Sequence, residues 1–214
     1  MKVGVLGTGD VGKVLASAMI QLGHEVKMGS REAANAKSAE WKQKNGERAS
    51  AGTFADAAKF GEIIFLCTLW SGTENAIQMA GPENFSGKVV IDTTNPLIFE
   101  PNQSPRLALG HTDSGGEQVQ RWISNAKVVK AFNIVGNAHM FHPKFECGPP
   151  TMFISGNDGD SKKKVTDLLA QFGWETIDIG GIEGSRLLEP LCILWVNYGF
   201  KTGTWNHAFK LLRK

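Results

Sequence analysis

The sequence predicts an α/β protein with a doubly wound parallel sheet and a small helical extension at its C-terminal end. Three observations predict this class. Short apolar runs alternate with segments of helical periodicity along residues 1–180. Some of these runs, such as residues 63–67, are apolar throughout, which is typical of a strand covered on both faces of a parallel sheet. A glycine-rich turn also separates the first apolar run from the first amphipathic segment.

The first strand is expected over residues 2–6, and the turn behind it has the spacing of a dinucleotide-binding fingerprint. This turn reads Gly7-Thr8-Gly9-Asp10-Val11-Gly12. Gly7 permits the tight turn, Gly9 leaves no side chain between the backbone and a pyrophosphate, and Gly12 lets the next helix pack closely on the sheet. The helix begins at about residue 11 and ends before Gly23, and its first turn offers free amide hydrogens to a pyrophosphate. The domain is therefore expected to be of Rossmann type.

The end of the second strand, expected over residues 25–28, indicates which dinucleotide is bound. An NAD-binding chain carries Asp or Glu here, and that carboxylate bonds the ribose hydroxyls and repels a phosphate. This chain carries Ser30 and Arg31 instead, and a guanidinium binds phosphate through a planar, charged fork. The pair predicts NADP as the cofactor. The alternative for Arg31 is a solvated surface charge at the start of a helix.

The remaining elements continue the alternation. The other strands are expected at residues 63–67, 89–92, 128–132, 151–155 and 175–179. The other helices are expected at residues 31–44, 53–58 (capped by Thr53), 73–80, 114–123 and 161–172. From residue 183 the chain is helical and then aromatic-rich, and this segment either packs over the sheet or forms a partner interface. We divide the chain into a nucleotide-binding domain over residues 1–180 and a helical extension over residues 181–214.

Composition excludes several classes of protein. The 214 residues carry 23 Lys and Arg against 21 Asp and Glu, and no stretch combines basic with aromatic residues as a nucleic-acid surface does. The longest apolar run, residues 187–200, is too short for a membrane span and contains Glu189 and Pro190. The three cysteines match no disulfide or metal spacing, and Cys67 is expected to be a small core residue. We expect a cytoplasmic protein that binds neither nucleic acid, membrane nor metal.

Ligands of an open parallel sheet bind outside the carboxyl ends of its strands. Four loops are expected there, at residues 7–12, 68–72, 93–96 and 133–139. They contain no Ser-His-Asp set, no cysteine beside a base and no paired carboxylates, so no catalytic acid or base is predicted. Direct hydride transfer between two stacked cofactors fits this composition, because it needs close approach and exclusion of water more than a proton shuttle.

Five motifs, in their order along the chain, resemble those of a known family. They read GTGDVG, GSR, LCTLW, VVKAFN and SRLLEPLCILW. The set is similar to that of the NADP oxidoreductases that use the deazaflavin coenzyme F420, and to the related cytosolic oxidoreductase domain of six-transmembrane metalloreductases. The resemblance implies a Rossmann-type domain with a small helical extension, a homodimer, NADP as cofactor, and F420 or a flavin as the small-molecule hydride acceptor.

The resemblance also implies which residues bind the cofactor. The glycine loop and the Ser-Arg pair hold NADP, one loop flanks the dinucleotide, and residues 133–137 lie under the nicotinamide. With Asn95 from the loop at residues 93–96, the expected cofactor-binding residues are Gly7, Thr8, Gly9, Asp10, Val11, Gly12, Ser30, Arg31, Thr68, Leu69, Trp70, Asn95, Asn133 and Gly136. Trp70 either stacks on a ring of the ligand or fills the core.

The chain departs from the family's pattern at Asn133, Gly136 and Asn137, where the deazaflavin enzymes carry a His and then a Pro-Ala pair. The second substrate therefore stays open among the deazaflavin, an ordinary flavin and a small carbonyl or imine. A sensor module that binds NADPH without turnover is the alternative outside the enzymes. A dehydrogenase of the imine-reductase or phosphogluconate type is a third reading, for which the tail of about thirty residues is short.

Overall fold

The computed structural model describes residues 1–101 and 103–214. The strands are β1 (Lys2–Leu6), β2 (Glu25–Ser30), β3 (Ala49–Thr53), β4 (Ile63–Leu66), β5 (Val89–Asp92), β6 (Leu97–Ile98), β7 (Arg106–Leu107), β8 (Lys127–Lys130), β9 (Thr151–Gly156) and β10 (Glu175–Asp178). The helices are α1 (Asp10–Gln21), α2 (Ala36–Asn45), α3 (Phe54–Phe60), α4 (Trp70–Ala80), α5 (Gly115–Trp122), α6 (Gly159–Gln171) and α7 (Ser185–Thr202). Short 3-10 turns lie at η1 (Pro82–Phe85), η2 (Asn137–His139) and η3 (Ile182–Gly184).

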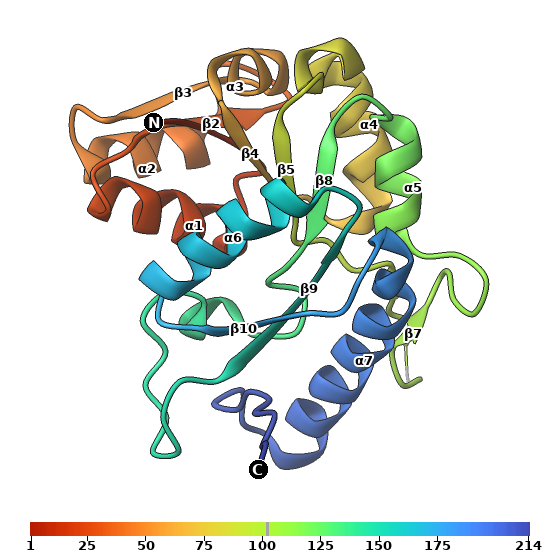
Figure 1. Ribbon diagram of the computed structural model, residues 1–214. Coiled ribbons are helices and arrows are strands. Elements are labelled where there is room, and N and C mark those ends of the chain that lie inside the picture. The colour runs from red at the N-terminus through yellow and green to blue at the C-terminus, as the bar shows by residue number, and fades with distance from the viewer. Residues whose placement is uncertain (102) are drawn as a thin grey trace.

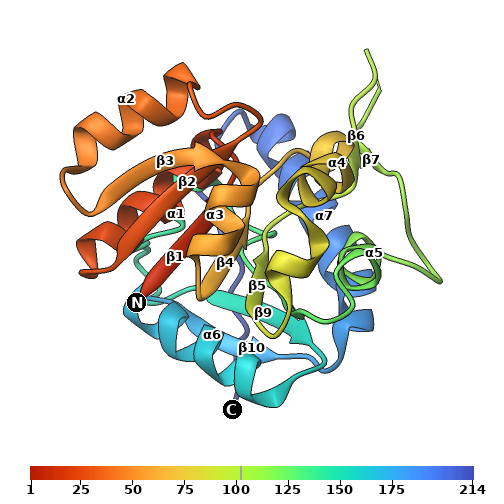
Figure 2. The same cartoon turned by 90° about the horizontal axis from the view of Figure 1, so that it is seen from above.

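The core of the fold is an eight-stranded sheet in the order β10-β9-β8-β5-β4-β1-β2-β3 (Figure 1). The six strands from β8 to β3 run parallel, in the strand order of a doubly wound dinucleotide-binding sheet. Helices α1, α2 and α6 pack on one face, and α3, α4 and α5 pack on the other. The predicted Rossmann-type architecture is confirmed. β6 and β7 form a separate hairpin that projects beyond the helices (Figure 2).

The sheet is mostly parallel rather than wholly parallel, because β9 runs against β8. The segment that joins these two strands carries only the short turn η2. A parallel connection needs a crossover, usually a helix, that returns the chain to the starting edge, whereas an antiparallel one does not. β10 then pairs in parallel with β9, through the crossover helix α6.

Two local predictions differ from the structure at the edge beyond β2. The helix predicted from residue 31 begins at Ala36, because Asn35 caps it: its Oδ1 accepts hydrogen bonds from the amides of Lys37 (3.0 Å) and Ser38 (3.2 Å). β3 is not predicted, because its sequence Ala-Ser-Ala-Gly-Thr contains few residues that favour strands. The predicted cap at Thr53 is confirmed, with its hydroxyl 3.1 Å from the amide of Asp56.

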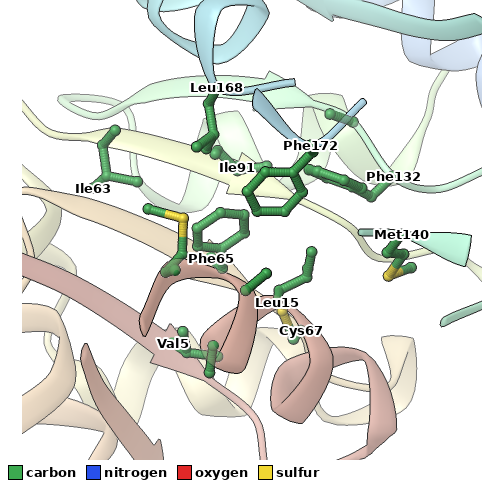
Figure 3. Close-up of a cluster of buried hydrophobic side chains, with 14 of the residues drawn as sticks. Val5, Leu15, Ile63, Phe65, Cys67, Ile91, Phe132, Met140, Leu168 and Phe172 are labelled. Carbon is green, nitrogen blue, oxygen red and sulfur yellow. The ribbon is translucent and has the colours of Figure 1, made fainter. Parts of the chain in front are cut away.

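The larger of the two main hydrophobic clusters lies between the sheet and helices α1 and α6. Phe65 from β4 and Leu15 from α1 meet Phe172 from the end of α6 there (Figure 3). The rings of Phe132 and Phe172 pack with their centroids 5.6 Å apart. Cys67 fills a small apolar space in this cluster, as predicted, and burial raises the pKa of its thiol to about 12. It is therefore not available as a nucleophile.

Helix α7 both packs on the body of the protein and presents an apolar outer side. Its buried residues Cys192, Trp195 and Val196 form a third hydrophobic cluster, and the helix contacts α5, β7 and β9. Leu187 and Leu194 on the other side are mostly exposed. The division of the chain at residue 180 stays a prediction. Among the described residues, no helix combines the length and apolar character that crossing a membrane requires.

The buried aromatic cluster is expected to contribute strongly to stability. Phe172→Ala removes a fully buried ring and leaves a cavity, which costs about 3–5 kcal/mol of the free energy of unfolding. Urea unfolding measures this loss. Phe99→Ala, at a phenylalanine that is 61% exposed, is the matched control and is expected to change stability by less than about 0.5 kcal/mol. Similar losses in the two variants would contradict the assignment of the core.

Candidate functional site

The loops that follow β1, β2, β4, β5 and β8 lie at one edge of the sheet, because these strands are parallel. This carboxyl edge holds residues 7–9, 30–35, 67–69, 93–96 and 131–136. The structure therefore brings together the four loops that the sequence predicts, with the Ser30-Arg31 turn beside them.

The turn after β1 is made by close approaches of the backbone. Gly7 has a φ of +130°, and a Cβ there would overlap the carbonyl oxygen of Cys67. A Cβ on Gly12 would overlap the carbonyl oxygen of Gly7. Gly9 is different, because no described atom lies within 4 Å of a Cβ placed on it. The protein's own packing thus explains glycine at two positions, while at Gly9 the backbone is open to a ligand.

The N-terminus of α1 offers unpaired donors at this edge. Gly9 is the N-cap residue and no side chain caps the helix. The first amide to bond within the helix is that of Lys13, which lies 2.9 Å from the carbonyl oxygen of Gly9. The amides of Asp10, Val11 and Gly12 therefore have no partner among the described residues, as is usual for the first turn of a helix. Together with the helix dipole, they can hold an anion.

The end of β2 places a cation next to these amides. Ser30 is buried, and its hydroxyl donates a hydrogen bond to the carbonyl oxygen of Glu32, so that its hydrogen is used in the turn. Arg31 is exposed and makes no ion pair or side-chain hydrogen bond with any residue that the structure describes. It lies in the turn before α2 and not at the start of the helix. The guanidinium is accordingly the group at this position that can meet a phosphate.

The loop after β4 leads into α4, which begins at Trp70 and not at residue 73 as predicted. Within its first turn the hydroxyl of Thr73 lies 2.9 Å from that of Thr68 and donates to the carbonyl oxygen of Leu69 at 3.0 Å. Leu69 is 84% exposed and presents an apolar side chain to the edge. Trp70 stacks on Trp122 of α5 with the ring centroids 5.5 Å apart, which supports the packing interpretation of this residue.

The loops after β5 and β8 are joined by a pair of side-chain amides. Asn95 Nδ2 donates to the carbonyl oxygen of Asn133 at 2.9 Å. Asn133 Nδ2 donates to Asn95 Oδ1 at 3.2 Å and to the carbonyl oxygen of Leu188 in α7 at 2.8 Å. Just before this pair, the buried Phe132 has a φ of +61°, a strained conformation for a bulky residue that costs about 1–3 kcal/mol. Strain of this kind is common at functional sites.

A buried lysine lies directly beneath these loops, and the sequence analysis misses it. Lys130 Nζ lies 2.9 Å from Asp92 Oδ2, 2.9 Å from Glu189 Oε1 and 2.7 Å from the carbonyl oxygen of Thr94. The three charged side chains are at most 1% exposed. Burial acts to lower the pKa of Lys130, but the two carboxylates outweigh it and the pKa is raised. The lysine therefore stays charged and binds the two acids together.

Glu189 connects this cluster to a third element. Its two carboxylate oxygens also accept hydrogen bonds from the amides of Gly115 (2.9 Å) and Gly116 (3.0 Å), the first residues of α5. The sequence carries a signal for the cluster: an acid ends the apolar run Val-Val-Ile-Asp, a lysine ends Val-Val-Lys, and Glu189 interrupts an apolar segment. A charged residue at the end of a buried strand, or inside an apolar segment, either reaches the surface or needs a buried partner of opposite charge.

Other candidate residues have structural roles that need no ligand. A Cβ on Gly136 would lie 3.0 Å from the ring of Trp195, so packing alone favours glycine there. His139 lies 3.2 Å from the side-chain oxygen of Asn206. Within residues 1–101 and 103–214, His, Cys, Asp and Glu form no group of three that could hold a metal.

Two hollows flank the carboxyl edge. One, of about 590 Å³, lies between α1 and α2 and is lined by Val14, Ser17 and Trp41 among others. The other, of about 690 Å³, lies between residues 107–111 and the first turns of α7, beside Arg186 and Leu187. Neither the glycine turn nor Arg31 lines either of these two hollows.

The buried charge cluster is expected to be essential for stability. Glu189→Gln removes one of the two negative charges on Lys130 and places an amide hydrogen against groups that are themselves donors, at a cost of about 3 kcal/mol in the free energy of unfolding. Glu183→Gln, at an exposed glutamate of η3, is the matched control and is expected to change stability by less than about 0.5 kcal/mol. Urea unfolding compares the two, and a small loss in Glu189→Gln would contradict this role.

Comparison with known proteins points to one family. The family model described as "NADP oxidoreductase coenzyme F420-dependent" matches residues 2–96, which include the glycine turn, Arg31 and Asn95. A crystal structure assigned as an F420-dependent NADP reductase from Arthrobacter sp. FB24 is 36% identical, with a TM-score of 0.93 and 100% of each chain covered. The F420-dependent NADP reductase of Methanothermobacter marburgensis is 29% identical over 99% of this chain and 98% of its own length.

A second kind of relative matches this chain over only part of the relative's own length. The metalloreductase STEAP3 of Rattus norvegicus is 26% identical over 89% of this chain, but the match spans 36% of that protein. The chain thus spans about a third of the metalloreductase's length and nearly all of the archaeal reductase's length. The resemblance predicted from the five motifs is confirmed, and the chain belongs to the family of F420-dependent NADP oxidoreductases.

Proposed function

We propose that this NADP-dependent oxidoreductase transfers a hydride directly between NADP(H) and a flavin-like acceptor, with the deazaflavin F420 as the preferred one. The observation that carries the proposal is the arrangement at the carboxyl edge. Three unpaired amides of α1 lie there beside the open backbone of Gly9, and the guanidinium of Arg31 has no partner among the described residues. This set of donors fits a pyrophosphate and a further phosphate ester.

Each half of the edge has its own part in binding. The amides of Asp10 and Val11 would bind the pyrophosphate, and Arg31 would bind the phosphate on the adenosine ribose. A dinucleotide lies across a sheet of this strand order, so its nicotinamide half belongs over the ends of β4, β5 and β8. Leu69, Asn95 and Asn133 lie there. Bound NADPH supplies the hydride, and the chain's own residues orient the ring and shield it from water.

The residues at the edge favour a flavin-like acceptor over a small carbonyl or imine. Reduction of a carbonyl or imine adds a proton to the reacting bond as well as a hydride. The acids and the lysine of the buried cluster are fully paired, and the thiol of Cys67 has a pKa of about 12. No other described carboxylic acid, histidine or cysteine belongs to the loops at residues 67–69, 93–96 and 131–136. Hydride transfer between two rings does not require a proton donor at the reacting atom.

Rapid mixing of the NADPH-loaded protein with F420, with FMN and with a cyclic imine tests the proposed reaction. We expect NADPH to be oxidised in step with reduction of F420, and faster than with either of the other acceptors. NADPH oxidation that is fastest with the imine would contradict the proposal. If no acceptor speeds the oxidation of bound NADPH, the protein is a sensor and not an enzyme of this kind.

Arg31 is expected to select NADP over NAD. Arg31→Ala should weaken binding of NADPH by about 1–3 kcal/mol, because a charge-assisted hydrogen bond to phosphate is lost, and should leave binding of NADH nearly unchanged. Fluorescence titration with both nucleotides measures this. Arg48→Ala is the matched control, since this exposed arginine precedes β3 at the opposite edge of the sheet. Equal losses for both nucleotides in Arg31→Ala would refute its role.

We further propose that two copies of the chain pair through the outer side of α7. The large apolar side chains exposed on this side are Leu187, Leu194 and Tyr198, whose spacing of seven and four residues places them on one stripe of the helix. At roughly 100 Å² exposed for each, this stripe has about the size of an apolar patch that marks an interaction site. A twofold axis would place α7 against the same helix of its partner.

Light scattering after gel filtration tests this pairing. The protein is expected to run as a dimer, and the double variant Leu194→Asp/Tyr198→Asp as a folded monomer, because two charges would be buried at the centre of the interface. Met79→Asp places a charge at an exposed methionine of α4 and is expected to leave the dimer intact. A wild-type protein that is monomeric at every concentration would show that α7 has no such partner.

A further inference from the structure

The outer side of α7 carries a charge at each end as well as the apolar stripe of Leu187, Leu194 and Tyr198. Glu183 lies one turn before Leu187, in η3, and the residue that joins η3 to α7 has helical backbone angles, so the helical path is continuous. Lys201 lies in the last turn of α7. At 3.6 residues per turn, Glu183 and Lys201 both fall within about 20° of Leu194 around the helix axis. The stripe therefore has an acid at one end and a base at the other.

These two charges have no partner among the residues that the structure describes. Glu183 and Lys201 are both exposed, and neither forms an ion pair or a side-chain hydrogen bond with a described residue. A helix side that is apolar in the middle and oppositely charged at its ends is complementary to its own copy turned end to end. The charges therefore indicate which way round a second copy fits.

The positions along the helix agree on one such arrangement. In an antiparallel pair, residues that lie equally far on either side of the twofold axis face each other. Glu183 and Lys201 have their midpoint at residue 192, and Leu187 and Tyr198 have theirs between residues 192 and 193. One axis thus matches the charged pair and the apolar pair at the same time. In a parallel pair the acid would meet the acid and the lysine would meet the lysine, which is unfavourable.

We infer that two copies of this chain pair antiparallel along α7, with Glu183 against the partner's Lys201 and Leu187 against the partner's Tyr198. This inference rests on the pairing proposed above, to which it adds a direction and a register. The exposed ion pairs at the two ends contribute little to affinity and mainly exclude the parallel arrangement. The affinity comes from the apolar stripe between them.

The antiparallel pair also changes the surroundings of one hollow. The hollow of about 690 Å³ is lined by Leu187 and Ala108, among others. The amide of Ala108 lies 2.7 Å from the carbonyl oxygen of Pro96, at the end of the loop that follows β5. Because the partner's Tyr198 faces Leu187, the C-terminal end of the partner's α7 closes the outer side of this hollow. Each copy thus lies beside the carboxyl edge of the other.

Cysteine cross-linking tests the direction of the pair. Leu187→Cys and Tyr198→Cys are made separately, each with Cys147→Ser because Cys147 is exposed, and are treated with a bis-maleimide that spans about 10 Å, the distance between packed helices. We expect a cross-linked dimer from a mixture of the two variants and none from either alone, since like cysteines would lie about 16 Å apart along the helices. Phe200→Cys, exposed on α7 but off the stripe, is the matched control and should not cross-link with Leu187→Cys.

Charge reversal tests the register without any new cysteine. Glu183→Lys sets like charges together at both ends of the antiparallel pair, and we expect the dissociation constant of the dimer to rise about tenfold at low salt. Glu183→Lys/Lys201→Glu restores opposite charges at both ends and should return the constant to near the wild-type value. Glu83→Lys, at an exposed glutamate of η1, is the control and should leave the constant unchanged. Analytical ultracentrifugation over a dilution series measures each constant.

The outcomes separate this inference from the proposed pairing. Cross-linking of Leu187→Cys or Tyr198→Cys with itself would show a parallel pair and overturn the inference. A dimer that gives no cross-link in the mixture, or whose dissociation constant does not respond to Glu183→Lys, also overturns it and leaves the pairing intact. A wild-type protein that is monomeric contradicts the pairing itself. The charge-reversal comparison stands even if the cysteine variants do not fold.

Discussion

A lysine buried between two carboxylates connects the parts of this protein that form its functional edge. Lys130 at the end of β8 binds Asp92 at the end of β5 and Glu189 in the C-terminal helix, and Glu189 also bonds the first amides of α5. Burying a charge is costly unless its partners satisfy it fully. Here each charged group has several partners, so the cluster fixes α5, α7 and the two strand ends relative to one another.

The edge above this cluster has two different halves. On the side of β1 and β2 lie donors without partners among the described residues: the first amides of α1 and the exposed guanidinium of Arg31. On the side of β5 and β8, the charges lie below the surface and are neutralised, and the groups near the edge are the neutral amides of Asn95 and Asn133. The first half is suited to phosphates and the second to an uncharged ring. This division follows from the strand order, which places the two halves on opposite sides of the crossover at β1 and β4.

The sequence predicts what depends on local patterns. The alternation of apolar runs with helical segments, the glycine turn and the cap at Thr53 are all read within a few residues, and the structure confirms them. The start of α2 is local too, and the prediction of residue 31 is wrong because it overlooks Asn35 as the cap. β3 has little preference for a strand in its own sequence and is set by pairing with β2. The direction of β9 depends on the path of the segment that connects it to β8, and hydrophobic periodicity does not predict that path.

The parts of the site that the sequence does not predict come from contacts between segments that are far apart in the chain. Lys130 and Asp92 are 38 residues apart, and Glu189 meets Gly115 across 74 residues. Single-sequence patterns show that these residues carry charges at unusual positions, but not that they meet. The hydrogen bond of the Ser30 hydroxyl to Glu32 is likewise visible only in the structure, and it leaves Arg31 as the group that we propose for phosphate recognition.

We propose that the edge beside α1 binds a dinucleotide that carries an additional phosphate. Calorimetric titration of the wild-type protein with NADPH and with NADH, at low and at high salt, tests it most directly. NADPH is expected to bind at least about tenfold more tightly at low salt, and the difference should narrow as salt screens the exposed guanidinium. Equal affinities for the two nucleotides, or a preference that salt does not change, would contradict the account.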